Sequence, residues 1–106
     1  MNIVLSEFYD TDLSFLKWLT GFSEVSMYLS VSQEDTLRLL RLIKPEVLII
    51  SKKGENESNV IKRLKDDFPG TGMYCYTKSS GNEVLEDIKN NECFPVEVMM
   101  KKIIKI

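Results

Sequence analysis

Short apolar runs alternate along this chain with segments whose apolar residues recur at helical spacing. The strongest run is 47–50 (VLII), where four apolar residues stand between Pro45 and a polar Ser-Lys-Lys sequence. Continuous apolar runs of this length are typical of strands buried on both faces of a parallel sheet. We therefore expect 47–50 to lie at the centre of a sheet.

The whole chain is predicted to alternate strand and helix five times. The expected strands are 2–5, 25–30, 47–50, 73–77 and 92–94. The expected helices run from Asp10 or Thr11 to about Gly21, from Ser32 as the N-cap to Lys44, over about 60–68, from Ser79 or Ser80 to about 91, and over 96–104. With right-handed crossovers, this order predicts an α/β fold of three layers: a (βα)5 doubly wound parallel sheet in a single domain, 1–106.

Composition restricts the chemistry that the chain can perform. There is no histidine, and Cys75 and Cys93 are too far apart for a CxxC motif, which excludes Ser-His-Asp and Cys-His hydrolases and a phosphohistidine relay. The 14 basic and 16 acidic residues give a net charge of −2, so we expect no nucleic-acid partner. No apolar run approaches the roughly 20 residues of a membrane span, and the first residues lack the features of a secretion signal. We expect a cytoplasmic protein without a membrane span, metal or cofactor.

The ends of the predicted strands gather the side chains of a candidate site. Sites in doubly wound sheets lie at the carboxyl ends of the strands. Those ends are Ser6-Glu7-Phe8, Ser51, Thr77 and Phe94-Pro95.

These end residues, together with KPEVLIIS at 44–51, resemble the receiver domain of bacterial response regulators, the CheY-like superfamily with its flavodoxin-like fold. The resemblance places the phospho-accepting aspartate at Ser51 and the acidic pair that holds Mg²⁺ at Glu7 and Phe8. It places the switch Ser/Thr at Thr77, and the lysine that precedes a proline at Phe94. Three of these five positions have therefore lost the chemistry that the family uses.

Those losses predict a degenerate pseudo-receiver that acts by binding proteins and is not an enzyme. A serine without a base is a poor nucleophile, and Glu7 alone is one cation ligand where the family offers three. One alternative is the N-terminal localisation and dimerisation domain of a larger ParA/MinD-like ATPase of a pilus-assembly system. Further alternatives are a true phospho-accepting receiver, or a small enzyme with Glu7 as acid/base and Ser51 or Thr77 contacting substrate.

The resemblance also implies an interaction surface. Receivers commonly pair through their fourth helix, fifth strand and fifth helix, which predicts a homodimer through the last two helices of this chain. In such a dimer, acidic side chains of one copy would face basic side chains of the other across a two-fold axis. The predicted surface comprises Glu83, Glu86, Asp87, Lys101 and Lys102. Trp18 is a further candidate contact, because its helix carries more apolar residues than one buried face needs.

Overall fold

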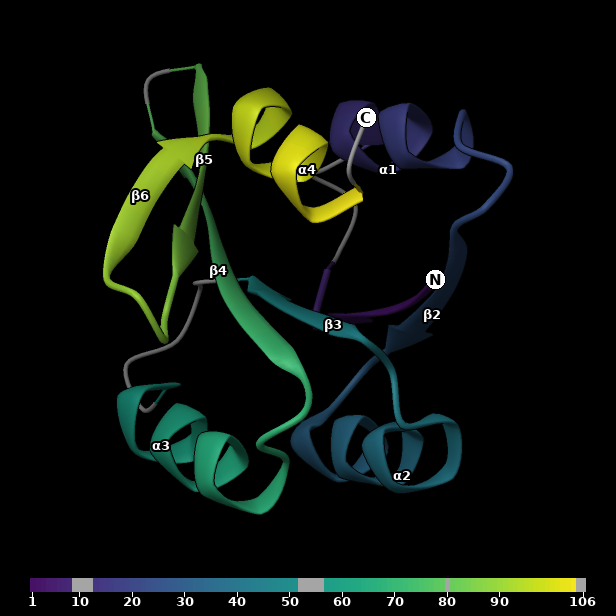
Figure 1. The fold of residues 1–106 in the computed structure, drawn as a ribbon, viewed down its shortest axis with the longest axis vertical. Helices are drawn as coiled ribbons and strands as arrows, with labels where there is room; N and C mark the ends of the chain where they lie inside the picture. Colours follow the sequence, from purple (N-terminus) through teal and green to yellow (C-terminus); the bar gives the residue numbers. More distant parts are fainter. Residues whose placement is uncertain (9–12, 52–56, 80, 105–106) are drawn as a thin grey trace.

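The computed structural model describes residues 1–8, 13–51, 57–79 and 81–104 (Figure 1). The strands are β1 (Asn2–Ser6), β2 (Ser26–Ser30), β3 (Val47–Ser51), β4 (Gly72–Ser79), β5 (Asn82–Asp87) and β6 (Glu92–Pro95). The helices are α1 (Leu13–Thr20), α2 (Gln33–Ile43), α3 (Glu57–Asp67) and α4 (Val96–Ile104). The expected helix start at Asp10 or Thr11 lies outside the described residues.

The strands form one mixed sheet in the order β2-β1-β3-β4-β5-β6. The pairs β1–β2, β1–β3 and β3–β4 are parallel, whereas β4–β5 and β5–β6 are antiparallel. The prediction of a (βα)5 doubly wound, all-parallel sheet is therefore wrong. The described part of the chain has a six-stranded mixed sheet and four helices.

The error arises in the segment 79–91, which was predicted to be a helix and instead contains β5. Only residues 80 and 81 separate β4 from β5, and Gly81 has a φ of +82°. A connection of this length with positive φ is what a tight β-hairpin requires. In the sequence alone, the spacing of Val84, Leu85 and Ile88 is compatible with a helix. In the sheet, however, Leu85 and Asp87 are buried while the residue between them is half-buried, which is the period of a strand.

A second turn carries the chain from β5 into β6. The buried carboxylate of Asp87 accepts hydrogen bonds from the backbone N–H groups of Lys89 (3.0 Å) and Asn90 (3.3 Å), and from the side-chain amide of Asn90 (2.9 Å). Asn91 then adopts the left-handed conformation, with a φ of 53°. Asp and Asn are suited to these two roles, so this turn is determined locally.

Helices cover both faces of the sheet, α1 and α4 one face and α2 and α3 the other (Figure 1). Each face has its own core of buried side chains. Alternate residues of β3 enter the two cores: Val47 and Ile49 pack with residues of α1 and α4, and Leu48 and Ile50 with residues of α2 and α3. This confirms that the run 47–50 is buried on both sides.

Helix α2 is held at both ends by local contacts. The Ser32 hydroxyl accepts a hydrogen bond from the backbone N–H of Asp35 at 3.1 Å, which confirms Ser32 as the N-cap. At the other end, Lys44 is left-handed with a φ of 50°, and Pro45 follows. None of the described helices is long and apolar enough to cross a membrane.

Candidate functional site at the carboxyl edge of the sheet

The parallel strands bring the carboxyl ends of β1, β3 and β4 to one edge of the sheet, which we call the carboxyl edge. Ser6 lies opposite Ile50, and Ser51 lies opposite Tyr76. Thr77 is the next residue of β4. The strand order reverses between β1 and β3, because β2 lies on one side of β1 and β3 on the other. Crevices that bind ligands form at such reversals.

Glu7 and Phe8, the positions of the expected acidic pair, take different environments. Glu7 has a φ of 59°, and its backbone N–H donates to the carbonyl of Ser30 at 2.9 Å. Its side chain is half-buried. Phe8 turns toward the sheet, and its ring contacts that of Tyr76 with 5.2 Å between centroids and a tilt of 49°. Phe8, at the second position of the expected acidic pair, therefore makes an apolar contact.

Ser51, the position of the expected phospho-acceptor, is enclosed. It is 2% exposed at the end of β3, beside the equally buried Tyr76. A phosphoryl donor has to reach the oxygen that it modifies, and this oxygen lies below the surface.

Thr77 and Phe94 do not meet, because β5 lies between their strands. Thr77 pairs with Val84, and Phe94 pairs with Leu85 on the far side of β5. Two strand spacings separate β6 from β4, a distance of about 10 Å. The expectation that both residues line one site is corrected by this insertion. The ring of Phe94 instead lies beneath the ammonium group of Lys102, with Nζ 4.1 Å from the centroid.

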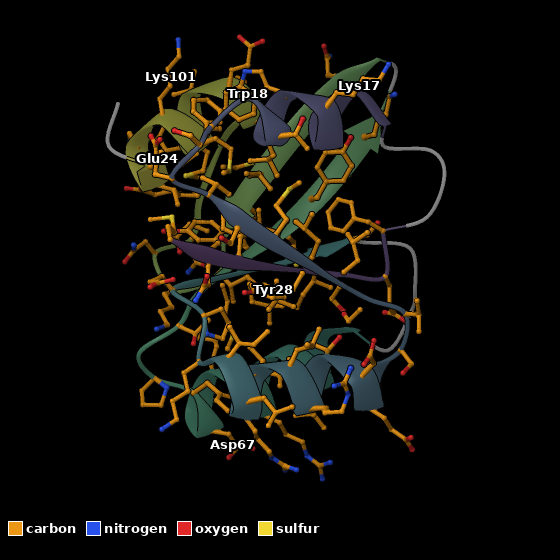
Figure 2. All side chains as sticks on the ribbon, turned by 90° about the vertical axis from the view of Figure 1, so that its right-hand side faces the viewer. Lys17, Trp18, Glu24, Tyr28, Asp67 and Lys101 are labelled. Carbon is orange, nitrogen blue, oxygen red and sulfur yellow. The ribbon has the colours of Figure 1, made fainter. Side chains whose placement is uncertain are left out.

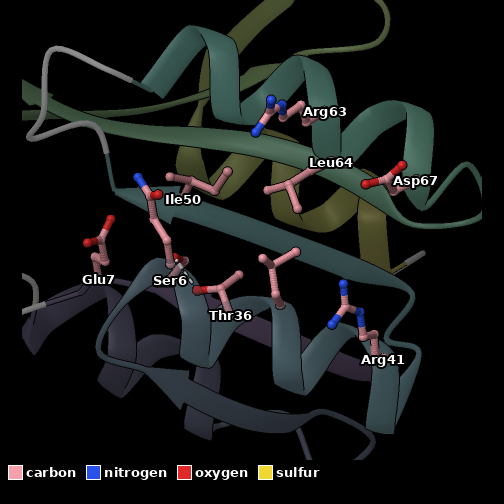
Figure 3. A pocket seen from close by; sticks show the side chains of 10 residues that line it. Ser6, Glu7, Thr36, Arg41, Ile50, Arg63, Leu64 and Asp67 are labelled. Carbon is pink, nitrogen blue, oxygen red and sulfur yellow. Dashed lines mark hydrogen bonds between the residues drawn. The ribbon is translucent and has the colours of Figure 1, made fainter.

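A groove of about 200 Å³ lies between α2 and α3, where β1 and β3 end (Figure 3). Buried apolar side chains of Ile50 and Leu64 form part of its wall. Charged side chains stand around it on both helices, Arg41 on α2 and Arg63 and Asp67 on α3 (Figure 3). The other lining residues are Ser6, Glu7, Gln33, Thr36 and Leu37.

A cluster of three buried hydroxyl groups lies at the end of this groove that is nearest the carboxyl edge. The Thr36 hydroxyl lies 2.8 Å from that of Ser6 and 2.6 Å from that of Ser30, and it donates to the carbonyl of Ser32 at 2.9 Å. Sequence reasoning missed this cluster and the two arginines. The available signal was weak: a serine at the end of each of two strands and a threonine in the first turn of the following helix.

As far as the described residues go, the groove and the carboxyl edge offer hydrogen bonds and charges but no activated nucleophile. The Ser6, Ser30 and Thr36 hydroxyls bond to one another and to backbone carbonyl groups, and none of the three bonds to a base in the described part of the chain. Within the described ranges, no group of three or more Asp, Glu or Cys side chains is placed to hold a metal ion. What this arrangement can do chemically is bind a small polar group.

The residues of the expected dimer surface are redistributed in the structure. Glu83, Glu86 and Asp87 lie on a strand, so the predicted interface of two helices does not form as described. Glu83 lies 3.9 Å from Lys78 across the β4–β5 ladder, and the Asp87 carboxylate is used within its own turn. Lys101 and Lys102 are exposed on α4 as expected.

Trp18 belongs largely to the core. It packs against the buried cluster under α1 and α4, and meets the ring of Phe22 edge-on with 4.9 Å between centroids. Figure 2 shows Trp18 and Lys101 at the same end of the molecule. The side chain is half-buried, so only part of it is left for a partner.

No family model matches the chain, and no curated protein and no solved structure matches it either.

Proposed function

We propose that this chain is a protein-interaction module that works without phosphorylation of its own. The observation that carries the proposal is the burial of Ser51. Ser51 is 2% exposed at the end of the central strand β3, where the resemblance to receivers expects an accessible acceptor. With Phe8 packed on Tyr76 beside it, the edge is filled by side-chain contacts.

The charges around Ser51 support the same proposal. Phosphoryl transfer requires a divalent cation or fixed cations to neutralise the phosphoryl oxygens. Glu7 supplies one carboxylate, and the neighbouring residue is Phe8. Of the expected acidic pair, Glu7 alone could hold a cation against a phosphoryl group on Ser51, and a buried charge that is not neutralised is strongly unfavourable.

Titration with Mg²⁺ and beryllofluoride, followed by amide chemical shifts, tests the proposal. Beryllofluoride with Mg²⁺ mimics a phosphoryl group on an acceptor, and we expect no shifts centred on Glu7, Ser51 and Thr77. An intact response-regulator receiver in a parallel sample shows that the reagent is active. Saturable shifts at those three residues in this chain would overturn the proposal.

A further inference from the structure

Strand β2 is an open edge of the sheet without two of the usual protections, charged side chains and proline. It ends the strand order on one side, and Figure 2 views the molecule from the side on which it lies. Residues 25–31 contain no charged residue and no proline. The opposite edge, β6, has four residues, begins at Glu92 and ends at Pro95. Charges, prolines and short length are how edge strands avoid pairing with other chains, and β2 lacks the first two.

The hydrogen bonds to β1 determine which backbone groups of β2 point outward. The N–H of Ser26 donates to the carbonyl of Met1, and the carbonyl of Ser30 accepts from Glu7, both at 2.9 Å. In a parallel ladder, alternate residues of an edge strand bond the neighbouring strand. The N–H and C=O groups of Met27 and Leu29 therefore point away from β1.

Exposed apolar side chains accompany this edge. Among the described residues the large exposed hydrophobic side chains are Met1, Leu29, Val31, Leu42 and Val98. Leu29 is 57% exposed on β2 and Val31 is 69% exposed just after it. Leu42, 70% exposed, lies on α2.

Leu42 is on the flank of α2 that faces the β2 side. The opposite flank, toward α3, is identified by the residues that line the groove, among them Gln33, Leu37 and Arg41. Around the helix, Leu42 lies about 100° from Arg41 and about 140° from Leu37, so it stands on the flank turned away from α3. An exposed apolar residue thus stands above the open edge in the helical layer as well.

We propose that a second copy of this chain binds here, with the two β2 strands paired antiparallel about a two-fold axis at Tyr28. This inference rests on the proposed interaction function and names its partner. Met27 then lies opposite Leu29 of the second copy, and the two residues exchange both backbone hydrogen bonds. The apolar side chains of each such pair meet on the α1 side of the sheet, and the two Tyr28 residues meet on the axis.

Helix α2 fits the same two-fold axis. It packs over β1 and β2, so pairing the two sheets would place the two α2 axes about 10 Å apart, close to the usual helix-packing distance. The helices would run antiparallel. On the flank that faces the second copy, Asp35 near the N-terminal end of one helix would approach Leu42 near the C-terminal end of the other. Arg38, between these two residues on the same flank, is paired with Asp35 of its own chain, so each copy presents a balanced pair of charges beside an apolar side chain.

The area available suits a reversible dimer. The edge from 25 to 31 is about 23 Å long, and the molecule measures 30 × 29 × 27 Å. The face that contains the edge with its helical layers is of the order of 600 Å² per copy, somewhat below the roughly 800 Å² per partner of a standard interface. We therefore expect an equilibrium between monomer and dimer at micromolar concentrations.

Sedimentation over about 5 to 500 µM tests the proposal with three variants. Leu29→Lys places a cation opposite Met27 of the second copy and is expected to weaken the dimer at least about tenfold. Val98→Lys makes the same change at an exposed apolar residue on α4 and is expected to leave the dimer intact. Lys101→Glu combined with Lys102→Glu tests the α4 surface and is also expected to leave it intact.

Three outcomes would overturn the proposal. They are a wild-type protein that stays monomeric throughout the range, a dimer that Leu29→Lys does not weaken, or a dimer that is lost in the variant with Lys101→Glu and Lys102→Glu. Urea unfolding establishes that Leu29→Lys is folded. None of these results bears on the beryllofluoride titration, so failure of the dimer and failure of the proposed function remain distinguishable.

A covalent trap tests the register even if Leu29→Lys fails to fold. In a Cys93→Ser background, Tyr28→Cys puts a thiol on the axis, where opposite Cα atoms lie within disulfide range at about 4.5 Å. Ser26→Cys in the same background is the control, because the two copies of residue 26 would be about 13 Å apart along the strands. Mild oxidation is expected to cross-link the first variant and not the second, and the reverse result would contradict the register.

Discussion

Ser51 and Phe8 show how single side chains decide what the carboxyl edge can do. Both occupy positions that the sequence relates to phosphoryl chemistry, and both are absorbed into packing. Ser51 is buried at the end of β3, and Phe8 lies against Tyr76. Removing the buried Ser51 hydroxyl or the aromatic contact of Phe8 would therefore act first on the stability of the fold. At this scale the edge is a structural feature with a small polar groove beside it.

Tyr74 provides a prediction at the residue scale. Burial raises the pKa of the Tyr74 phenol, and the negative charge of Asp87, opposite it in the β4–β5 ladder, raises this pKa further. The folded state therefore holds the phenolic proton more tightly than the unfolded chain, in which the pKa of tyrosine is about 10. The contribution to stability is intact below pH 10 and is lost as the pH rises through 10 toward the folded pKa.

Tyr74→Phe removes that proton and is expected to flatten the decline in stability above about pH 10. Urea unfolding of both proteins between about pH 8 and 11 measures this. Parallel curves for the two proteins would contradict the assignment of the raised pKa to Tyr74.

The β4–β5 hairpin is the element that distinguishes this fold from the expected one. It extends the sheet by antiparallel pairing and places β5 between the strands that carry Thr77 and Phe94. The turns before and after β5 are chemically different. The first depends on Gly81 with positive φ, and the second on the Asp87 carboxylate and on Asn91. The hairpin is thus encoded by a few turn residues and completed by pairing with β4.

Gly81→Ala tests the first turn. Open space surrounds the position of the new Cβ atom, so the cost arises from the backbone φ of +82° alone, and we expect a loss of about 1 kcal/mol in unfolding free energy. Gly70→Ala is a matched control, because its Cβ also meets open space and its φ lies outside the left-handed range. A chemical denaturation series should show a clear loss for the first variant and little change for the second. Equal effects would argue against a requirement for positive φ at 81.

At the scale of the whole molecule, the sheet separates two cores. Successive residues of β1 and β3 alternate between these cores. Ile3, Leu5, Val47 and Ile49 belong to one core, and Val4, Leu48 and Ile50 to the other. The radius of gyration is 12.7 Å, close to the value of about 13 Å for a compact domain of this length. Since consecutive residues of one strand serve opposite cores, the two helical layers are coupled through the sheet.

Ile49→Ala is expected to destabilise the whole molecule by about 2–5 kcal/mol, because it leaves a cavity in the central strand at a side chain with no exposure. Leu42→Ala, at a residue that is 70% exposed, should change stability by less than about 0.5 kcal/mol in dilute protein. Thermal unfolding followed by circular dichroism compares the two. A small effect of Ile49→Ala would contradict the central position of β3.

The sequence by itself determined the elements whose information is local. The apolar run 47–50 gives the central strand, Ser32 caps α2, and the apolar spacing after Pro95 gives α4. These features follow from burial on two faces, from hydrogen bonding at a helix end and from helical period, none of which needs a distant partner.

Only the tertiary structure decided the segment 79–91 and the composition of the site. Val84, Leu85 and Ile88 satisfy a helical spacing, but pairing with β4 places residues 82–87 in a strand. That pairing moves Phe94 two strands away from Thr77. The hydroxyl cluster of Ser6, Ser30 and Thr36 likewise exists because parallel pairing of β1 with β2 and the packing of α2 bring together residues up to 30 positions apart. Contacts over such separations depend on the whole fold, and for that reason no local pattern in the sequence contained them.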